Sequence, residues 1–315
     1  MPKNKILVTG ASGFIGKSIY QSLINSNYDV VGTYNNSKNH DSNLVHLDLC
    51  RLKKNFLMNK TINTVIHCAA KLSNGSNNSN ENKMGDINFS ATVELAKYCF
   101  DFEVQNFIFI SSAKVYGENS PINKPFDETA STNPIDDYAL SKLNAEKELI
   151  KLSHNYKRKL LILRLPIVYG AGVKGNILSL INHVKRGLPF PFKNIDNKKS
   201  YLALNNLVNF IEYYLINNTK LDEINPIYNI SDNYDVSTTY FIRKICKIYK
   251  KNIWFLPIPN FVIYVLFYLL NKKQLYKKLF GNLQININKI LNDTGWRPKY
   301  SIEDQLNFIF KKDIS

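Results

Sequence analysis

A glycine-rich turn near the start of the chain constrains the fold more than any other feature. Three glycines spaced three residues apart follow the apolar run 6–8 and open a helix-like stretch over 14–26. Glycine permits a tight turn and lets backbone N–H groups approach a phosphate, while the helix N-terminus adds a favourable dipole. The pattern predicts a strand, a turn and a helix that bind a dinucleotide pyrophosphate. The residues of this predicted cradle are Gly10, Gly13, Phe14, Ile15 and Gly16.

The first two-thirds of the chain alternates short apolar runs with longer amphipathic stretches. Strand-like runs lie at 6–8, 29–33, 45–47, 64–67, 107–110 and 160–163, and helix-like stretches at 14–26, 50–59, 86–103 and 137–155. This alternation predicts an α/β fold, with a parallel sheet covered by helices on both faces. After residue 170, helix-like segments at 175–186, 205–217, 237–250, 260–270 and 301–312 predict a smaller, mostly helical lobe. A strand-like run at 227–230 could return to the main sheet.

The charge and the cysteines of the chain indicate which partners and which compartment to expect. The 41 basic and 25 acidic residues give a net charge of +16, which indicates either anionic partners or a solvated basic surface. No nucleic-acid-binding module is recognisable. The four cysteines lack the C-x-x-C spacing of a zinc site or a disulfide scaffold, so no metal site is expected. A reducing compartment and the lack of a signal-peptide pattern predict a cytoplasmic protein.

The longest apolar run, 261–270, is too short to span a bilayer. Two lysine pairs follow it, at 272–273 and 277–278. Contact with a membrane surface is therefore one interpretation of this run. A buried helix of the small lobe is the interpretation that we favour.

A tyrosine and a lysine carry the predicted chemistry. Tyr138 and Lys142 are four residues apart in a helix-like stretch, so both side chains share one face. A phenol with a pKa of about 10 is a poor base, but a nearby ammonium and a nicotinium ring favour the phenolate. Ser112, at the end of a predicted strand, could hydrogen-bond the same reacting oxygen. We expect these three residues to exchange a proton with a sugar or alcohol oxygen.

Further motifs give these residues a family context. They are Asp48-Leu49, His67-Cys68-Ala69-Ala70, the 111–117 run SSAKVYG, the 164–170 run RLPIVYG and a terminal Gly295-Trp296-Arg297-Pro298. Together with the glycine turn and Tyr138-x-x-x-Lys142, they resemble the extended short-chain dehydrogenases/reductases of the nucleotide-sugar epimerase/dehydratase family.

The resemblance implies a Rossmann-type doubly wound sheet, with a dinucleotide-binding domain over 1–170 and a nucleotide-sugar-binding lobe over 171–315. It also implies a bound nicotinamide dinucleotide, with Ser112, Tyr138 and Lys142 as catalytic residues. The residues expected beside the cofactor, besides Tyr138, Lys142 and the glycine turn, are Tyr34, Asp48, Leu49, Ala69, Ala70, Asn88, Pro166 and Val168. A helix N-cap is a second role for Asp48.

The sequence leaves NAD and NADP unresolved. Tyr34 stands about where an acidic residue usually holds the adenosine ribose, and Asn35, Asn36, Ser37 and Lys38 follow it. The missing carboxylate removes the usual obstacle to a 2′-phosphate, and Lys38 could contact one. The sequence therefore slightly favours NADP.

The resemblance also bears on the reaction. Sugar-nucleotide 4,6-dehydratases place an Asp-Glu pair directly after the hydroxyl residue, whereas this chain has Ala113 and Lys114, so a dehydratase is not expected. We favour a ketoreductase acting on a UDP-4-keto-6-deoxy-N-acetylhexosamine in bacterial surface-polysaccharide synthesis. The alternative is a UDP-hexose 4-epimerase, and a remote one is a catalytically silent cofactor sensor. The expected partner is a UDP-sugar, and a homodimer is left open. The residues expected to bind the substrate are Ser112, Ala113, Lys114, Asn176 and Lys199.

Overall fold

A computed structural model of the chain describes residues 5–35, 42–52, 61–71, 86–193, 195–217, 225–271 and 273–314. Its centre is a seven-stranded sheet in the order β3-β2-β1-β4-β5-β6-β9, and all six pairings are parallel. The strands of this sheet are β1 (Lys5–Thr9), β2 (Val30–Tyr34), β3 (Val45–His46), β4 (Ile62–His67), β5 (Asn106–Ser112), β6 (Lys159–Leu165) and β9 (Ile227–Asn229).

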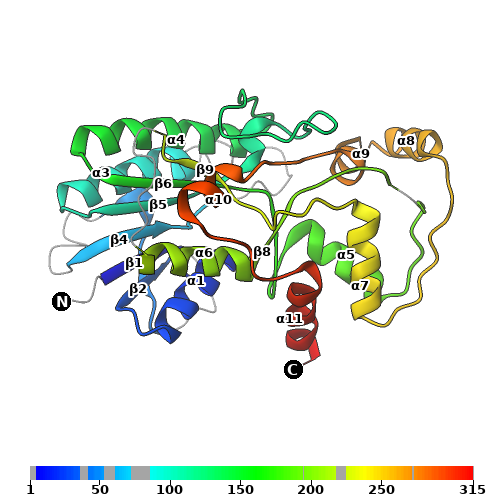
Figure 1. The fold of residues 1–315 in the computed structure, drawn as a ribbon, viewed down its shortest axis with the longest axis horizontal. Helices are drawn as coiled ribbons and strands as arrows, with labels where there is room; N and C mark the ends of the chain where they lie inside the picture. Colours follow the sequence, from blue (N-terminus) through cyan, green and yellow to red (C-terminus); the bar gives the residue numbers. More distant parts are fainter. Residues whose placement is uncertain are drawn as a thin grey trace.

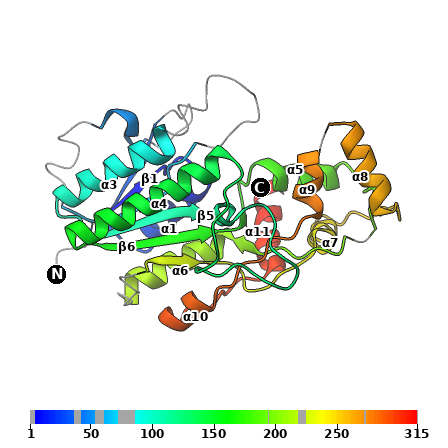
Figure 2. The same ribbon diagram turned by 90° about the horizontal axis from the view of Figure 1, so that it is seen from above.

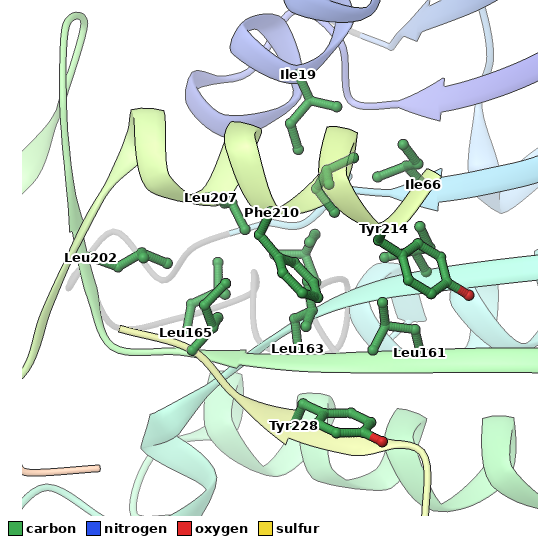
Figure 3. Close-up of a cluster of buried hydrophobic side chains, with 14 of the residues drawn as sticks. Ile19, Ile66, Leu161, Leu163, Leu165, Leu202, Leu207, Phe210, Tyr214 and Tyr228 are labelled. Carbon is green, nitrogen blue, oxygen red and sulfur yellow. The ribbon is translucent and has the colours of Figure 1, made fainter. Parts of the chain in front are cut away.

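Helices cover both faces of the sheet (Figures 1 and 2). They are α1 (Phe14–Asn25) and α6 (Leu204–Asn217) on one face and α3 (Ala91–Asp101) and α4 (Asp137–Tyr156) on the other. Alternate residues of β6 serve the two faces: Leu161 and Leu163 pack with α1 and α6, whereas Leu160 and Ile162 pack with α3 and α4. Figure 3 shows the first of these clusters. The predicted doubly wound Rossmann fold is confirmed.

The order of the strands fixes where a ligand can bind. The chain runs outward from β1 through β2 to β3, and then returns to β4 on the other side of β1. Connections that leave in opposite directions open a crevice at the carboxyl ends of β1 and β4, which is where open α/β sheets bind ligands. The glycine turn follows β1, and the 67–70 motif follows β4.

A smaller unit lies beyond the carboxyl ends of the strands (Figure 1). Its core is aromatic and aliphatic, with Tyr201 stacked on Phe241 at 4.4 Å between ring centroids. It contains a two-stranded sheet, β7 (Ile167–Tyr169) with β8 (Tyr201–Ala203). The helices in this region are α5 (Gly175–Lys185), α7 (Thr238–Ile248), α8 (Asn260–Leu269), α9 (Lys273–Phe280) and α11 (Ile302–Ile314).

Part of the chain after residue 170 returns to the main sheet. β9 pairs with β6, as the 227–230 run indicated, and α6 packs beside α1. α10 (Asn288–Thr294) contacts β9, and the terminal Gly-Trp-Arg-Pro motif follows it. Trp296 of that motif is buried edge-to-face against Phe210 of α6. The division into two domains at residue 170 stays a prediction.

Several local predictions differ from the structure. The predicted 50–59 helix is a single 3-10 turn, η1 (Leu49–Arg51), and residues 53–60 lie outside the described residues. α3 begins only after a π-helical turn, η2 (Asp86–Ser90). The short elements β7, β8, α9 and α10 were not predicted.

The expectation of a buried helix over 260–270 is wrong. Ile263 is the residue of α8 that the small lobe buries, and most of the other apolar side chains of this helix are exposed. Among the described residues, no helix is both long and apolar enough to cross a membrane.

Candidate active site

Gly10 and Gly16, in the turn after β1, have no room for a side chain. Gly10 adopts a left-handed φ of +67°, and a Cβ there would lie 2.8 Å from the backbone N and Cα of Ala69. A Cβ on Gly16 would lie 2.3 Å from the Gly10 carbonyl oxygen. Gly13 caps α1 with no side-chain hydrogen bond. The backbone therefore forms a bare cradle at a helix N-terminus, which suits the pyrophosphate that the sequence predicted.

The end of β4 forms the other wall of the crevice. His67 is fully buried between two hydroxyls, with Nδ1 at 2.7 Å from Thr9 Oγ1 and Nε2 at 2.9 Å from Thr92 Oγ1. Burial, reinforced by the charge of Lys142, lowers the pKa of His67 to about 3, so the ring is neutral. This histidine ties β1, β4 and α3 together, and Thr9 Oγ1 also accepts from the Ala69 N–H at 3.4 Å.

Asn88 holds the backbone that follows the predicted Ala69 and Ala70. Its Oδ1 accepts from the Lys71 N–H at 2.8 Å, and its Nδ2 donates to the Lys71 carbonyl at 2.9 Å. The side chain of Asn88 is fully buried. Asn88 therefore shapes the wall of the crevice, because both functions of its amide are occupied by one backbone residue.

The predicted catalytic residues meet at the carboxyl end of β5. Lys142 is buried on α4, and its Nζ donates to the Ile110 carbonyl at 2.9 Å, two residues before Ser112 ends the strand. The same Nζ lies 4.5 Å from the ring centroid of Phe109 and 6.0 Å from that of Tyr138. The structure therefore places Ser112, Tyr138 and Lys142 around one end of the sheet, as the spacing predicted.

Both side chains of the pair are buried, and burial shifts the pKa of each. Burial, with a smaller effect of the Asp136 carboxylate, raises the pKa of Tyr138 to about 12. Burial also lowers the pKa of Lys142 to about 8, despite the opposing influence of Cys68 and Glu146. In the protein alone, desolvation is the largest cause of both pKa shifts. Tyr138 is therefore a protonated donor at neutral pH.

Asp136 links the predicted substrate residues to α4. Its Oδ1 accepts from the Ala139 N–H at 2.8 Å and so caps the helix, while its Oδ2 pairs with Lys114 Nζ at 2.6 Å. Burial acts against the charged form of Asp136, but the bonds from Lys114 and Ala139 outweigh it and lower the pKa of Asp136. Ala113, beside Lys114, is buried. The Lys114 ammonium is thereby fixed next to the start of the helix that carries Tyr138.

A buried ionic network below Lys142 was not predicted. Glu146 lies one turn after Lys142 on α4 and pairs with Arg164 of β6, at 2.6 Å between Oε2 and Nη2. Ser111 Oγ donates to the same carboxylate, and the Arg164 guanidinium lies 4.7 Å from the ring centroid of Tyr116. The four-residue spacing of Lys142 and Glu146 signals one shared face, but the partner strand follows only from the fold.

Several residues that were predicted to lie beside the cofactor have structural contacts of their own. Asp48 caps η1, with Oδ1 accepting from the Cys50 N–H at 3.0 Å, so the N-cap role is confirmed. Leu49 is buried in the core beside α3. Tyr34 ends β2 with its ring edge-to-face on His46, at 5.4 Å between centroids, and Lys38 lies outside the described residues. Pro166 and Val168 are half-buried where the chain passes from β6 to β7.

The two remaining substrate predictions fall in different environments. Asn176 is exposed in the first turn of α5, whose N-cap is Lys174. Lys199 is buried, and its ammonium donates to the Lys278 carbonyl. Burial lowers the pKa of Lys199 to about 8. A lysine ammonium has three N–H donors, and this bond uses one of them.

Comparison with known proteins places this site in a family. The model of the NAD dependent epimerase/dehydratase family matches residues 6–231. The chain is 36% identical to a UDP-glucose 4-epimerase of Vibrio cholerae over 310 residues, which cover 96% of this chain and 93% of that protein. It is 24% identical to the dTDP-4-dehydro-6-deoxyglucose reductase of Escherichia coli, over 98% of this chain and 97% of the relative.

A solved structure agrees in fold. The UDP-glucose 4-epimerase of Thermotoga maritima, crystallised with UDP-glucose, superposes with a TM-score of 0.79 over 98% of both chains at 23% identity. The family match, the glycine cradle at the switch point of the sheet and the end-to-end similarity to the Vibrio protein agree. The chain belongs to the NAD-dependent epimerase/dehydratase family of nucleotide-sugar enzymes.

Proposed function

We propose that this protein is a 4-epimerase of a UDP-hexose, with Ser112, Tyr138 and Lys142 as its catalytic residues. The observation that carries the proposal is the similarity to the Vibrio cholerae UDP-glucose 4-epimerase, which extends over 96% of the chain at 36% identity. This similarity favours the epimerase over the ketoreductase that the sequence alone suggested. The expected substrates are UDP-glucose and UDP-N-acetylglucosamine.

The residues divide the work of oxidising and reducing C4 of the sugar. A bound nicotinamide dinucleotide supplies the chemistry of accepting a hydride from C4 and returning it. Tyr138 exchanges the proton of the C4 oxygen, because its phenol stands at the start of α4 beside the end of β5. Lys142 is held rigidly by Ile110, and its charge favours the phenolate when Tyr138 gives up its proton. Ser112 hydrogen-bonds the same sugar oxygen.

Dehydration does not fit the residues that follow Ser112. Ala113 has no acid or base, and Lys114 is paired with Asp136 at 2.6 Å. Eliminating water requires a group that removes a proton and one that protonates the leaving hydroxyl. These residues therefore do not support dehydration. We propose instead that Ser112, Ala113 and Lys114 border the sugar. Asn176 and Lys199 are proposed to meet the diphosphate.

The cofactor cradle consists of the glycine turn, the Ala69–Ala70 backbone and the 166–168 segment. Its fit is set by the missing side chains at Gly10 and Gly16, since a Cβ at either position would meet backbone within 3 Å. Tyr34 ends β2 without a carboxylate, and exposed Asn35 follows it. The acid that would repel a 2′-phosphate is thus missing at this position, so NADP is not disfavoured there.

The missing carboxylate at the end of β2 also supports a second candidate function. A 4-ketoreductase must exchange its cofactor in every turnover, and a site without a ribose carboxylate suits weaker and reversible binding. An epimerase regenerates its own cofactor and gains from tight binding. The two functions therefore differ in cofactor retention and in stoichiometry.

One experiment separates the candidates. The purified protein is analysed for bound dinucleotide, and is then incubated with UDP-glucose, with UDP-N-acetylglucosamine or with UDP-4-keto-6-deoxy-N-acetylglucosamine plus NADH or NADPH. The epimerase proposal predicts bound cofactor and interconversion of C4 epimers with none added. Stoichiometric consumption of reduced cofactor with the keto-sugar, and no epimerisation, would establish the reductase instead.

A further inference from the structure

One helix of the small unit presents an apolar surface to solvent. α8 contains no charged residue, and its sequence NFVIYVLFYL is apolar on every side. Ile263 and Phe267, one turn apart, face the core of the small unit. The opposite stripe consists of Phe261, Val265 and Leu269, whose exposed fractions are 71%, 48% and 75%. Apolar side chains clustered in this way mark a contact surface.

α9 holds α8 in this position. Tyr276 of α9 lies 5.2 Å from Tyr264 and 6.0 Å from Phe267 between ring centroids, and Tyr276 stacks on Phe280 at 4.4 Å. The two helices thus form a packed pair in which the stripe of α8 faces outward. Both views place α8 at the end of the molecule opposite the seven-stranded sheet (Figures 1 and 2).

The chain segment that contains α8 and α9 carries charge of one sign. Residues 236–292 contain ten lysines and arginines and no aspartate or glutamate, so this segment carries +10 of the net +16. Lys273, Lys277 and Lys278 of α9 are exposed. Lys273 Nζ lies 3.7 Å from the ring centroid of Tyr268, so this cation borders the apolar surface. An apolar helix edged by lysines is the combination that binds at an anionic lipid surface.

We propose that α8 and α9 form a membrane-surface contact, in which the stripe of α8 enters the headgroup region of an anionic bilayer and Lys273 and Lys277 of α9 pair with lipid phosphates. A ten-residue helix rises roughly 15 Å, half the hydrocarbon thickness, so α8 would lie in the interface. A second copy of the chain is a poorer occupant. A two-fold contact would bring one +10 segment against another, and like charges oppose it. The proposal is independent of the proposed function.

The test uses the full chain and vesicles of stated composition. Co-sedimentation is measured with phosphatidylcholine vesicles and with vesicles containing about 30 mol% phosphatidylglycerol. We expect binding to the anionic vesicles, and its loss as salt is raised to about 1 M, where charges are screened beyond roughly 3 Å. Lys273→Gln with Lys277→Gln should weaken binding roughly 25-fold, since each lysine near the surface contributes roughly five-fold. Phe261→Ser with Leu269→Ser should weaken it at least about ten-fold.

Matched controls isolate the contact. Ile122→Ser with Ile135→Ser removes two apolar side chains that are similarly exposed, at 74% and 63%, but lie outside α8, and it should leave vesicle binding unchanged. Thermal unfolding of each variant shows whether it is folded. Equal binding to neutral and anionic vesicles, or no binding to either, would overturn the proposal. So would a concentration-dependent dimer that Phe261→Ser abolishes, because the stripe would then belong to a second copy.

Discussion

Replacing Lys142 with Met should stabilise the protein at neutral pH while it removes activity. The ammonium is buried, and lowering its pKa from 10.5 to about 8 corresponds to roughly 3 kcal/mol of native-state stability lost. Met has a similar length and no charge, and it can pack on Phe109. Losing the hydrogen bond to the Ile110 carbonyl offsets about 1 kcal/mol of this gain in stability. The net expectation is a free energy of unfolding higher by about 2 kcal/mol at pH 7.

The pH dependence of this difference identifies its cause. Below pH 8 the lysine is charged in both states, and the full cost of burial applies. Between pH 8 and 10.5 the unfolded chain keeps the proton that the native protein has released, so wild-type stability rises with pH at up to about 1.4 kcal/mol per pH unit. The advantage of the Met variant should therefore disappear by about pH 10.

Urea unfolding followed by tryptophan fluorescence, to which the buried Trp296 contributes, measures both free energies at each pH. Subtracting the two cancels the other titrating groups. Lys147→Met, which changes an exposed lysine on the same helix, is the control and should stay within about 0.5 kcal/mol of wild type. A Lys142→Met variant that is less stable at pH 7, by an amount independent of pH, would refute the reasoning.

Three further substitutions test the site. Tyr138→Phe should lower turnover about 10²–10⁴-fold and leave dinucleotide affinity in calorimetry unchanged, since only the transferable proton is lost; near-normal turnover would contradict its role. Gly10→Ala should cost at least about 2 kcal/mol in urea unfolding, because the left-handed φ is strained and the new Cβ meets the Ala69 backbone; unchanged stability would contradict the turn geometry. Glu146→Leu should cost about 3–5 kcal/mol by leaving the Arg164 guanidinium unpaired, and adding Arg164→Met should restore most of it; failure of this rescue would mean that Glu146 acts mainly through other contacts.

The parts of the fold that sequence predicted are those with local signals. The buried strands read as apolar runs, and the glycine spacing signals a backbone cradle because no other residue fits at Gly10. Tyr138 and Lys142 were found because four residues on a helix bring two side chains to one face. β7 and β8 were not predicted, because they pair with each other from separate parts of the chain and this pairing is not visible in the sequence.

Other features depend on contacts between distant segments. Glu146 and Arg164 meet only because α4 packs across β5 and β6, so the network under Lys142 follows from tertiary structure. The burial of Tyr138, which raises the pKa of its phenol, likewise follows from tertiary structure and is not visible in the sequence. α8 was misjudged because its apolar composition predicts burial, whereas the small unit covers only the side with Ile263 and Phe267.

The central claim is that C4 of a UDP-hexose is oxidised and reduced again within one site. The direct measurement is to incubate the protein with UDP-glucose carrying deuterium at C4, with no added cofactor, and to follow both epimers by NMR. The account predicts a C4 epimer that keeps its deuterium, since the hydride leaves and returns without exchange with water. Tyr138→Phe should suppress this product. Failure to form the epimer from either UDP-glucose or UDP-N-acetylglucosamine, or an epimer whose deuterium has been lost to solvent, would contradict the account.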